Sequence, residues 1–367
     1  MMRSVTGDEL DALLKRHEAF WRREPGSLLL HVRREEAEPG SLHAPLSGVT
    51  VPLPDGSDLA AQHTPITPDQ LDPSLILDID EFPRRTGRIE GPGPHAVDAL
   101  LVTRAPLGKM VWVESILGCP VIPRLDTGSI YSAPFLEDIG DLSSLPKPEE
   151  SPWLDVLLRY TRLLAQASNG EYQVVQCLMR GTIDLVSAVM GHSEMCYALY
   201  DNPKAVRELT EHCTRTFIMV AKRQEELWPQ LKGGYTHAFA VWAPGTVVRT
   251  QCDVTSSVSA QMYEEFFIPY ENEICSHFDY SAVHLHSGYL HTVDVFLKDK
   301  YPTAVEVALD TGSTPHTVHS LIPTFQRILE EKPLFIHGRM TGRELDECLE
   351  RLPHRGLYIS TLSPINE

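Results

Sequence analysis

The chain has 367 residues, of which 42% are hydrophobic and 22% charged, as in a globular protein large enough for one barrel or two ordinary domains. A formal net charge of −18 argues against nucleic-acid and anionic-membrane partners, which attract basic surfaces, and no apolar run approaches the ~20 residues that span a bilayer. The seven cysteines form no CxxC pair and the N-terminus lacks the apolar centre of a signal peptide, so we expect a protein of the reducing cytoplasm.

Residues 1–70 are expected to add a helix, a first strand and a loop to the main domain. Thr6 and Glu9 form a capping-box pattern ahead of leucines at helical spacing, which predicts an N-terminal helix. Residues 27–35 then read as a strand. Residues 36–70 are rich in proline, glycine and acidic residues without a clear period, so we interpret them as a lid-like loop.

From residue 71 to residue 367, short apolar runs alternate with helical patterns. The clearest helices are predicted at 201–228, at 257–278 with a break near Pro269, and at 317–332. The predicted strands are 75–80, 110–114, 172–179, 236–242, 247–253, 281–286, 304–310, 333–337 and 356–360. This alternation predicts an α/β fold, and the number of runs suits an eight-stranded barrel with extra hairpins. An open doubly wound sheet is the alternative, but the first strand leads into HVRREEAEPG, which is not a glycine-rich nucleotide-binding turn.

Polar residues two positions apart share one face of several predicted strands. They are His31 and Arg33; Asp78 and Asp80; Trp112 and Glu114; Arg249, Gln251 and Asp253; His284 and His286; Glu306 and Asp310; and, alone, His337. Active sites of barrel enzymes lie at the C-terminal ends of the strands, where such residues would meet in one mouth. Any single one of them is most simply a solvated rim group or a satisfied hydrogen-bonder. Burying so many ionisable groups together is costly unless they pair, bind metal or contact substrate, and this favours an enzyme.

His284 and His286 can bind one metal ion from the same face of a strand, since neutral imidazole is a common ligand of zinc, iron and nickel. The candidates for a third ligand are Asp253, Glu306, Asp310, Glu114 and His337. Asp253 is also a catalytic candidate, because its carboxylate can stabilise a developing positive charge or fix the tautomer of a ligating histidine. The alternatives are substrate binding or plain packing for the histidines and a helix cap for Asp253.

Several segments resemble the uroporphyrinogen decarboxylase superfamily. They are DVTSSVSAQMYEEFFIPYENEI followed by VHLHSG, GTIDLVSAVMGHSEMCYALYDNPKAVREL, ESILGCPV and the terminal LYISTLSPINE, spread over about residues 75–367. The resemblance implies a distorted (β/α)8 TIM barrel, here with an N-terminal helical and loop extension. It also implies one of two activities. The decarboxylases of the superfamily act on tetrapyrroles without metal or organic cofactor, whereas their relatives use zinc to move a methyl group between a corrinoid protein and a thiol.

The chain departs from both patterns. The Arg-Gln-Ala-Gly-Arg run of the decarboxylases is absent from HVRREEAEPG, which offers Arg33 and Arg34 instead. The zinc methyltransferases use His-x-Cys and a distant cysteine; here His284 matches the histidine, His286 takes the cysteine position, and residues 360–361 hold no cysteine.

We therefore predict a methyltransferase of this superfamily that acts on a small-molecule substrate with a corrinoid or thiol acceptor and binds zinc or another divalent metal at His284 and His286. Asp253 joins these two histidines as a catalytic residue. Substrate contacts are predicted for Arg33, Glu114, Trp242, Arg249, Gln251, Glu306, Asp310 and His337. A corrinoid protein and a second copy of the chain are the expected partners. The alternatives are a cofactor-independent decarboxylase of a tetrapyrrole or other polycarboxylate and a non-catalytic tetrapyrrole- or corrinoid-binding protein.

Overall fold

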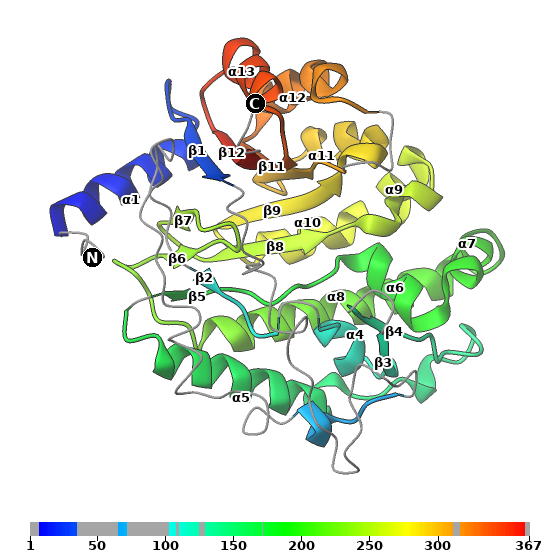
Figure 1. Ribbon diagram of the computed structural model, residues 1–367. Helices are drawn as coiled ribbons and strands as arrows, with labels where there is room; N and C mark the ends of the chain where they lie inside the picture. Colours follow the sequence, from blue (N-terminus) through cyan, green and yellow to red (C-terminus); the bar gives the residue numbers. More distant parts are fainter. Residues whose placement is uncertain are drawn as a thin grey trace.

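Six parallel strands lie side by side in the order β1–β12–β11–β10–β9–β8 (Figure 1). They are β1 (Leu29–Arg34), β8 (Val247–Gln251), β9 (Tyr280–His286), β10 (Ala304–Ala308), β11 (Leu334–Arg339) and β12 (Leu357–Ser363). The computed structural model describes residues 7–34, 65–71, 103–107, 110–124, 129–170, 172–310 and 316–363. Because β1 pairs with β12 along its whole length, the first strand joins the last, as in a barrel.

Two further parallel strands, β2 (Thr103–Arg104) and β5 (Gln173–Val174), pair with each other. Gln176, just after β5, joins this pair to β8: its Nε2 donates to the carbonyl oxygen of Arg249 (2.7 Å), and its Oε1 accepts from the amide of Arg249 (2.9 Å). Between β5 and β8, a side-chain amide thus takes the place of the backbone hydrogen bonds that join neighbouring strands, so the barrel wall is irregular at this point. The predicted fold class, α/β with a distorted (β/α)8 TIM barrel, is confirmed.

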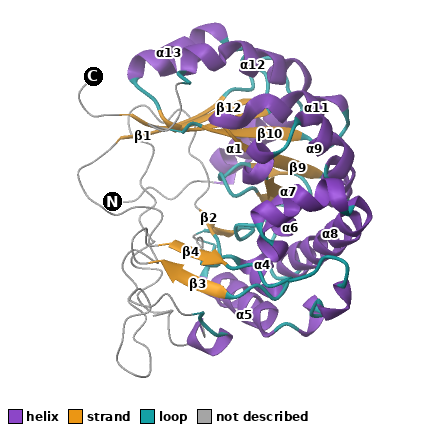
Figure 2. Cartoon of the chain, turned by 90° about the vertical axis from the view of Figure 1, so that its right-hand side faces the viewer, coloured by secondary structure: helices purple, strands orange, loops and turns teal. Residues whose placement is uncertain are grey.

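Helices form most of the rest of the described chain, and most of them lie along the outer side of the strands (Figure 2). They are α1 (Gly7–Trp21), α4 (Trp112–Ile116), α5 (Pro152–Ala167), α6 (Thr182–Met190), α7 (His192–Asp201), α8 (Pro203–Glu225), α9 (Ala260–Phe266), α10 (Ile268–Ser276), α11 (Val293–Lys298), α12 (Val318–Glu331) and α13 (Gly342–Arg351), with short 3-10 turns η2 (Pro68–Leu71), η3 (Leu142–Ser144), η4 (Pro148–Glu150), η5 (Asp253–Ser257) and η6 (Ser287–Thr292). Capping boxes at Thr317 and Thr341 begin α12 and α13. The predicted break near Pro269 is confirmed, since this residue lies in the first turn of α10.

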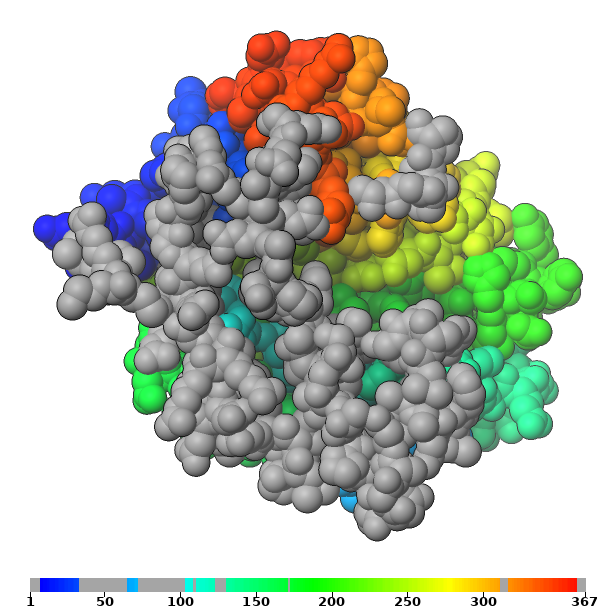
Figure 3. Space-filling view, viewed as in Figure 1, coloured from blue at the N-terminus to red at the C-terminus, as the bar shows by residue number. Residues whose placement is uncertain are grey.

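The first strand of the described chain, β1, lies beside the last one, β12, and blue residues border red ones in the upper part of the molecule (Figure 3). The first strand is therefore part of the barrel wall. The boundary between an extension of residues 1–70 and a barrel of residues 71–367 stays a prediction. Within the described ranges, every helix is too short or too polar to cross a bilayer.

Two predicted strands differ from the structure. Residues 110–114 were expected as a strand, which is wrong: Trp112–Ile116 form the helix α4, all five residues of which are buried. A helix without a polar face gives a short continuous apolar run, which periodicity cannot distinguish from a buried strand. Residues 236–242 form a tight antiparallel hairpin of β6 (Tyr235–Thr236) and β7 (Trp242–Ala243).

Other predicted elements lie wholly or partly outside the described residues. The predicted strand 75–80, with Asp78 and Asp80, is one of them, and most of the lid-like loop is another. The end of that loop forms η2, and Ile66 just before it makes an isolated bridge to Val121 of β3 (Val121–Arg124), the partner of β4 (Ser129–Ser132).

The capping box of α13 gives a stability prediction. Thr341 Oγ1 accepts from the amide of Glu344 (3.2 Å), and Glu344 Oε2 accepts from the amide of Thr341 (2.9 Å). We expect Thr341→Ala to lower the free energy of unfolding by about 1 kcal/mol, because the amide of Glu344 loses its partner. Urea denaturation measures this change. Asp346→Ala, at an exposed position inside the same helix, serves as the control, and equal stability of the two variants would contradict the prediction.

Candidate active site

The candidate site lies at the C-terminal ends of β8 to β11. The strand register places Gln251, His284 and Glu306 next to one another on three adjacent strands. Two residues further along the strands, His286 of β9 and His337 of β11 flank Ala308 of β10. Because side chains alternate along a strand, residues at these two levels point to the same face, and the polar residues converge.

Glu306 connects several of these side chains. It is 0% exposed, and its two carboxylate oxygens each accept a hydrogen bond of 2.9 Å from the guanidinium of Arg249. Its Oε1 also contacts Nδ1 of His284 and lies 3.2 Å from Nε2 of His337. Burial alone would raise the pKa of Glu306, but the charge of Arg249 brings this pKa well below its usual value. Glu306 is thus an ionised carboxylate that holds other residues in place, and its predicted contact with substrate stays a prediction.

A second carboxylate orients the second histidine. Nδ1 of His286 donates to Oδ1 of Asp310 (2.7 Å), while the amide of Asp310 donates to Ser287 Oγ (3.0 Å). Both histidines therefore use Nδ1 for a carboxylate and turn Nε2 toward the mouth. This arrangement of carboxylate, histidine and free Nε2 is the one that protein metal sites use to fix the tautomer of a ligand.

Three potential ligand atoms face one another. Nε2 of His284 lies 3.3 Å from Nε2 of His286, and Oδ1 of Asp253 lies 3.2 Å from the same Nε2 of His286. Two ligands of one tetrahedral zinc ion, each at about 2.05 Å, are about 3.3 Å apart, close to these spacings. Oδ1 of Asp253 is buried, and His286 is the one described residue that approaches it as a donor. The residues present thus fit a divalent metal.

The charges of the histidines differ. Burial, with the nearby charge of Arg249, lowers the pKa of His284 to about 4, so its imidazole is neutral. Asp253, and after it Asp310, raises the pKa of His286 to about 9 against the effect of burial. A protonated His286 cannot bind metal, so a metal would bind in exchange for this proton.

Asp253 is fixed from two sides. Gln251 Nε2 donates to its Oδ2 (2.6 Å), and Asp184 of α6 accepts from its amide (3.0 Å). Burial would raise the pKa of Asp253, but hydrogen bonds from His286 and Gln251 lower it to about 2. Asp253 begins η5, and its side chain faces the histidines.

Two residues near the mouth were missed by the sequence reasoning: Arg180 and Asp184. Arg180, whose side chain is 31% exposed, donates through Nη1 to Oε1 of the buried Glu114 (2.7 Å). Glu114 therefore pairs with an arginine, and its predicted substrate contact stays a prediction. Asp184 lies in the GTIDL segment, so the family resemblance was the signal that could have found it, whereas Arg180 directly precedes that segment.

Two further residues, Trp242 and Arg33, were predicted to contact substrate. Trp242 belongs to the hairpin that precedes β8, at the opposite end of the strands; its indole donates to the carbonyl oxygen of Leu231 (2.8 Å), and its backbone bonds His17 and Trp21 of α1. Its buried ring cannot reach the mouth, which corrects this prediction. The backbone of Arg33 lies on β1, while its side chain is outside what the structure describes.

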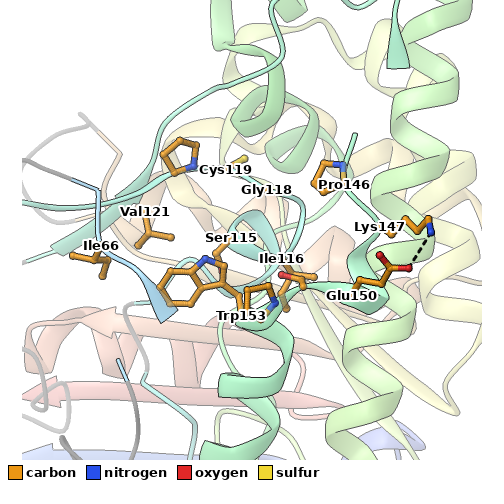
Figure 4. A pocket seen from close by; sticks show the side chains of 13 residues that line it. Ile66, Ser115, Ile116, Gly118, Cys119, Val121, Pro146, Lys147, Glu150 and Trp153 are labelled. Carbon is orange, nitrogen blue, oxygen red and sulfur yellow. Dashed lines mark hydrogen bonds and ion pairs between the residues drawn. The ribbon is translucent and has the colours of Figure 1, made fainter. Parts of the chain in front are cut away.

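A cavity of about 460 Å³ lies apart from the mouth, between α4, β3 and the start of α5 (Figure 4). Its charged residues, Lys147 and Glu150, pair with each other at 2.9 Å. The hydroxyl of Ser115 donates to the carbonyl oxygen of Trp112 (2.8 Å). With these polar groups already satisfied, the cavity presents no comparable ligand set, and the mouth is the better candidate.

Ionisable side chains at the C-terminal ends of barrel strands define the usual place of an enzyme active site. Residues 107–228 match the family model "Uroporphyrinogen decarboxylase (URO-D)", and this range contains the ESILGCPV and GTIDL segments. A solved structure of a methyltransferase from Methanosarcina mazei shares the fold, with a TM-score of 0.60 over 97% of this chain and 94% of that one at 13% identity. No curated protein sequence matches the chain. The predicted resemblance to the uroporphyrinogen decarboxylase superfamily is thus confirmed for residues 107–228, and the solved structure shows that the fold is shared.

Proposed function

We propose that the chain is a methyltransferase related to the uroporphyrinogen decarboxylases, with a divalent metal, zinc in the first place, bound by His284, His286 and Asp253. The observation that carries this proposal is the convergence of two Nε2 atoms and one carboxylate oxygen, Oδ1 of Asp253, within 4.8 Å of one another. Two nitrogens and one oxygen leave an open position on a tetrahedral metal, as in catalytic zinc sites.

When bound, the metal would supply Lewis acidity at the methyl donor or acceptor. The chain's own residues prepare the site for it. Glu306 and Asp310 accept hydrogen bonds from Nδ1 of the two histidines, so that both Nε2 atoms point inward, and His286 would give up its Nε2 proton when a metal binds. Arg249 keeps Glu306 ionised and in place, and Gln251 orients Asp253 through Oδ2, so that Oδ1 faces the histidines. A corrinoid, carried by a partner protein, or a thiol is the proposed methyl acceptor, and a homodimer is the proposed assembly.

A decarboxylase is the second candidate, favoured by the pKa of Asp253, which is lowered to about 2. An ionised carboxylate in the mouth could stabilise a protonated intermediate without any metal. The two functions therefore differ in whether a metal is needed.

Metal analysis of the untagged protein tests the proposal. We expect about one divalent metal per chain after purification, or one equivalent taken up by metal-free protein on titration with Zn²⁺ or Co²⁺. Methyl transfer between methylcobalamin and candidate thiols should be lost on chelation and restored by Zn²⁺. If neither the purified nor the titrated protein bound a divalent metal, the result would contradict the proposed metal site and favour the decarboxylase.

A further inference from the structure

The start of α6 contacts the first residues of η5, which include Asp253. Oδ2 of Asp184 accepts from the amide of Asp253 (3.0 Å), and Oδ1 accepts from the amide of Val254 (2.8 Å). Asp184 is 3% exposed, so it contacts no substrate in the mouth. Its two oxygens are thus used on two successive amides, which fixes the backbone from which the Asp253 carboxylate extends.

The carboxylate of Asp184 accepts its hydrogen bonds from η5 and not from the amides of its own helix. The amide and hydroxyl of Thr182 both donate to Oε1 of the buried Glu271, at 2.6 and 2.8 Å, so another residue supplies the first turn of α6. The carboxylate of Asp184 is therefore free to reach across to η5.

Gly181, the residue before Thr182, allows the start of α6 to lie close to residues 251–254. Its amide donates to the carbonyl oxygen of Gln251 (2.5 Å). A Cβ atom at this position would lie 3.0 Å from both that oxygen and Cys252 Sγ, and 2.5 Å from Glu271 Oε1. Any side chain at position 181 would push α6 away from residues 251–254, so the close approach of the two segments depends on glycine.

We propose that Asp184 is a positioning residue for the metal ligand Asp253, fixing the backbone of residues 253 and 254 so that Oδ1 faces the two histidines. This inference rests on the proposed function, because it assigns Asp253 as a ligand. It concerns α6, which contributes no ligand of its own.

The test compares Asp184→Asn with Asp279→Asn in the full-length, metal-free protein. Asp279 accepts from the amide and hydroxyl of Thr246 at the opposite end of β8, so the control makes the same chemical change outside the mouth. An asparagine at 184 has one acceptor oxygen for two amides. We expect Asp184→Asn to weaken Zn²⁺ and Co²⁺ binding about 10- to 100-fold, as changes behind metal ligands do, and to alter the visible spectrum of bound Co²⁺. Asp279→Asn should match the wild type in both.

Equal metal affinity and an unchanged Co²⁺ spectrum in Asp184→Asn would overturn the positioning role, even if its stability fell. If that variant does not fold, Gly181→Ala should weaken metal binding in the same way without removing a polar group. Amide exchange in the wild type provides a measurement without variants: the amides of Asp253 and Val254 should exchange slowly before metal is added, and fast exchange would overturn the inference. A wild type that binds no metal, with these amides protected, would instead count against the proposed function alone.

Discussion

Replacing His286 with alanine is expected to weaken divalent-metal binding by at least ~100-fold, because loss of a residue that only supports a ligand already costs about 10- to 100-fold. His286 supplies one of the three facing ligand atoms, and its Nε2 lies within 3.3 Å of both of the others. The variant should fold normally, since the side chain is 30% exposed and Asp310 keeps its bond to the amide of Gly288 (3.3 Å). Competition with a chromophoric chelator measures the affinity.

His319→Ala is the matched control. This histidine lies exposed on α12, pairs with Glu347, and should be replaceable without effect on metal binding. If His286→Ala bound Zn²⁺ as tightly as His319→Ala, the metal would have to lie elsewhere, for example between His284, Glu306 and His337. Loss of methyl transfer in His286→Ala together with loss of metal would connect the site to the reaction.

The strands that build the mouth could be predicted because their side chains alternate. In β10, Val305 and Val307 point to the opposite face from Glu306, and β9 shows the same alternation around its histidines. This alternation predicts that the polar side chains of each strand lie on one face. Because the C-terminal ends of parallel strands lie at the same end of a barrel, these side chains were expected to gather there. The distances between them could not be predicted, since they depend on the register between β8, β9, β10 and β11, which the sequence does not specify.

The remaining parts of the site depend on contacts between residues far apart in the chain. Asp184 meets the amide of Asp253 across 69 positions, and Arg180 meets Glu114 across 66. Neither pair has a local pattern that would have revealed it. Trp242 shows the opposite case: its local pattern suited a strand, but the tight hairpin turned it to the far end of the wall. Local periodicity therefore predicts on which face of a strand a side chain lies, and tertiary packing determines which residues it contacts.

Glu306→Gln is expected to lower the free energy of unfolding by about 3–5 kcal/mol, as loss of one partner from a buried ion pair does. The side chain of Arg249 is 9% exposed and would be left with a buried, uncompensated charge. The pKa of Glu306 lies well below its usual value in the folded chain, so its ionised form contributes stability above its unfolded pKa. This contribution is lost as the pH falls through the folded pKa. Guanidinium denaturation at pH 7 measures the loss, and an unchanged midpoint would contradict it.

A double variant separates this charge effect from the positioning of the histidine. Arg249→Met with Glu306→Leu removes both charges, and since apolar residues can replace a buried pair at little cost, most of the lost stability should return. Metal affinity should not return, because Nδ1 of His284 would still lack the carboxylate that fixes its tautomer. We expect the double variant to unfold near the wild-type denaturant concentration and to bind Zn²⁺ about 10- to 100-fold more weakly. Wild-type affinity in this variant would show that Glu306 serves the ion pair alone and that His284 needs no carboxylate to turn Nε2 toward the mouth.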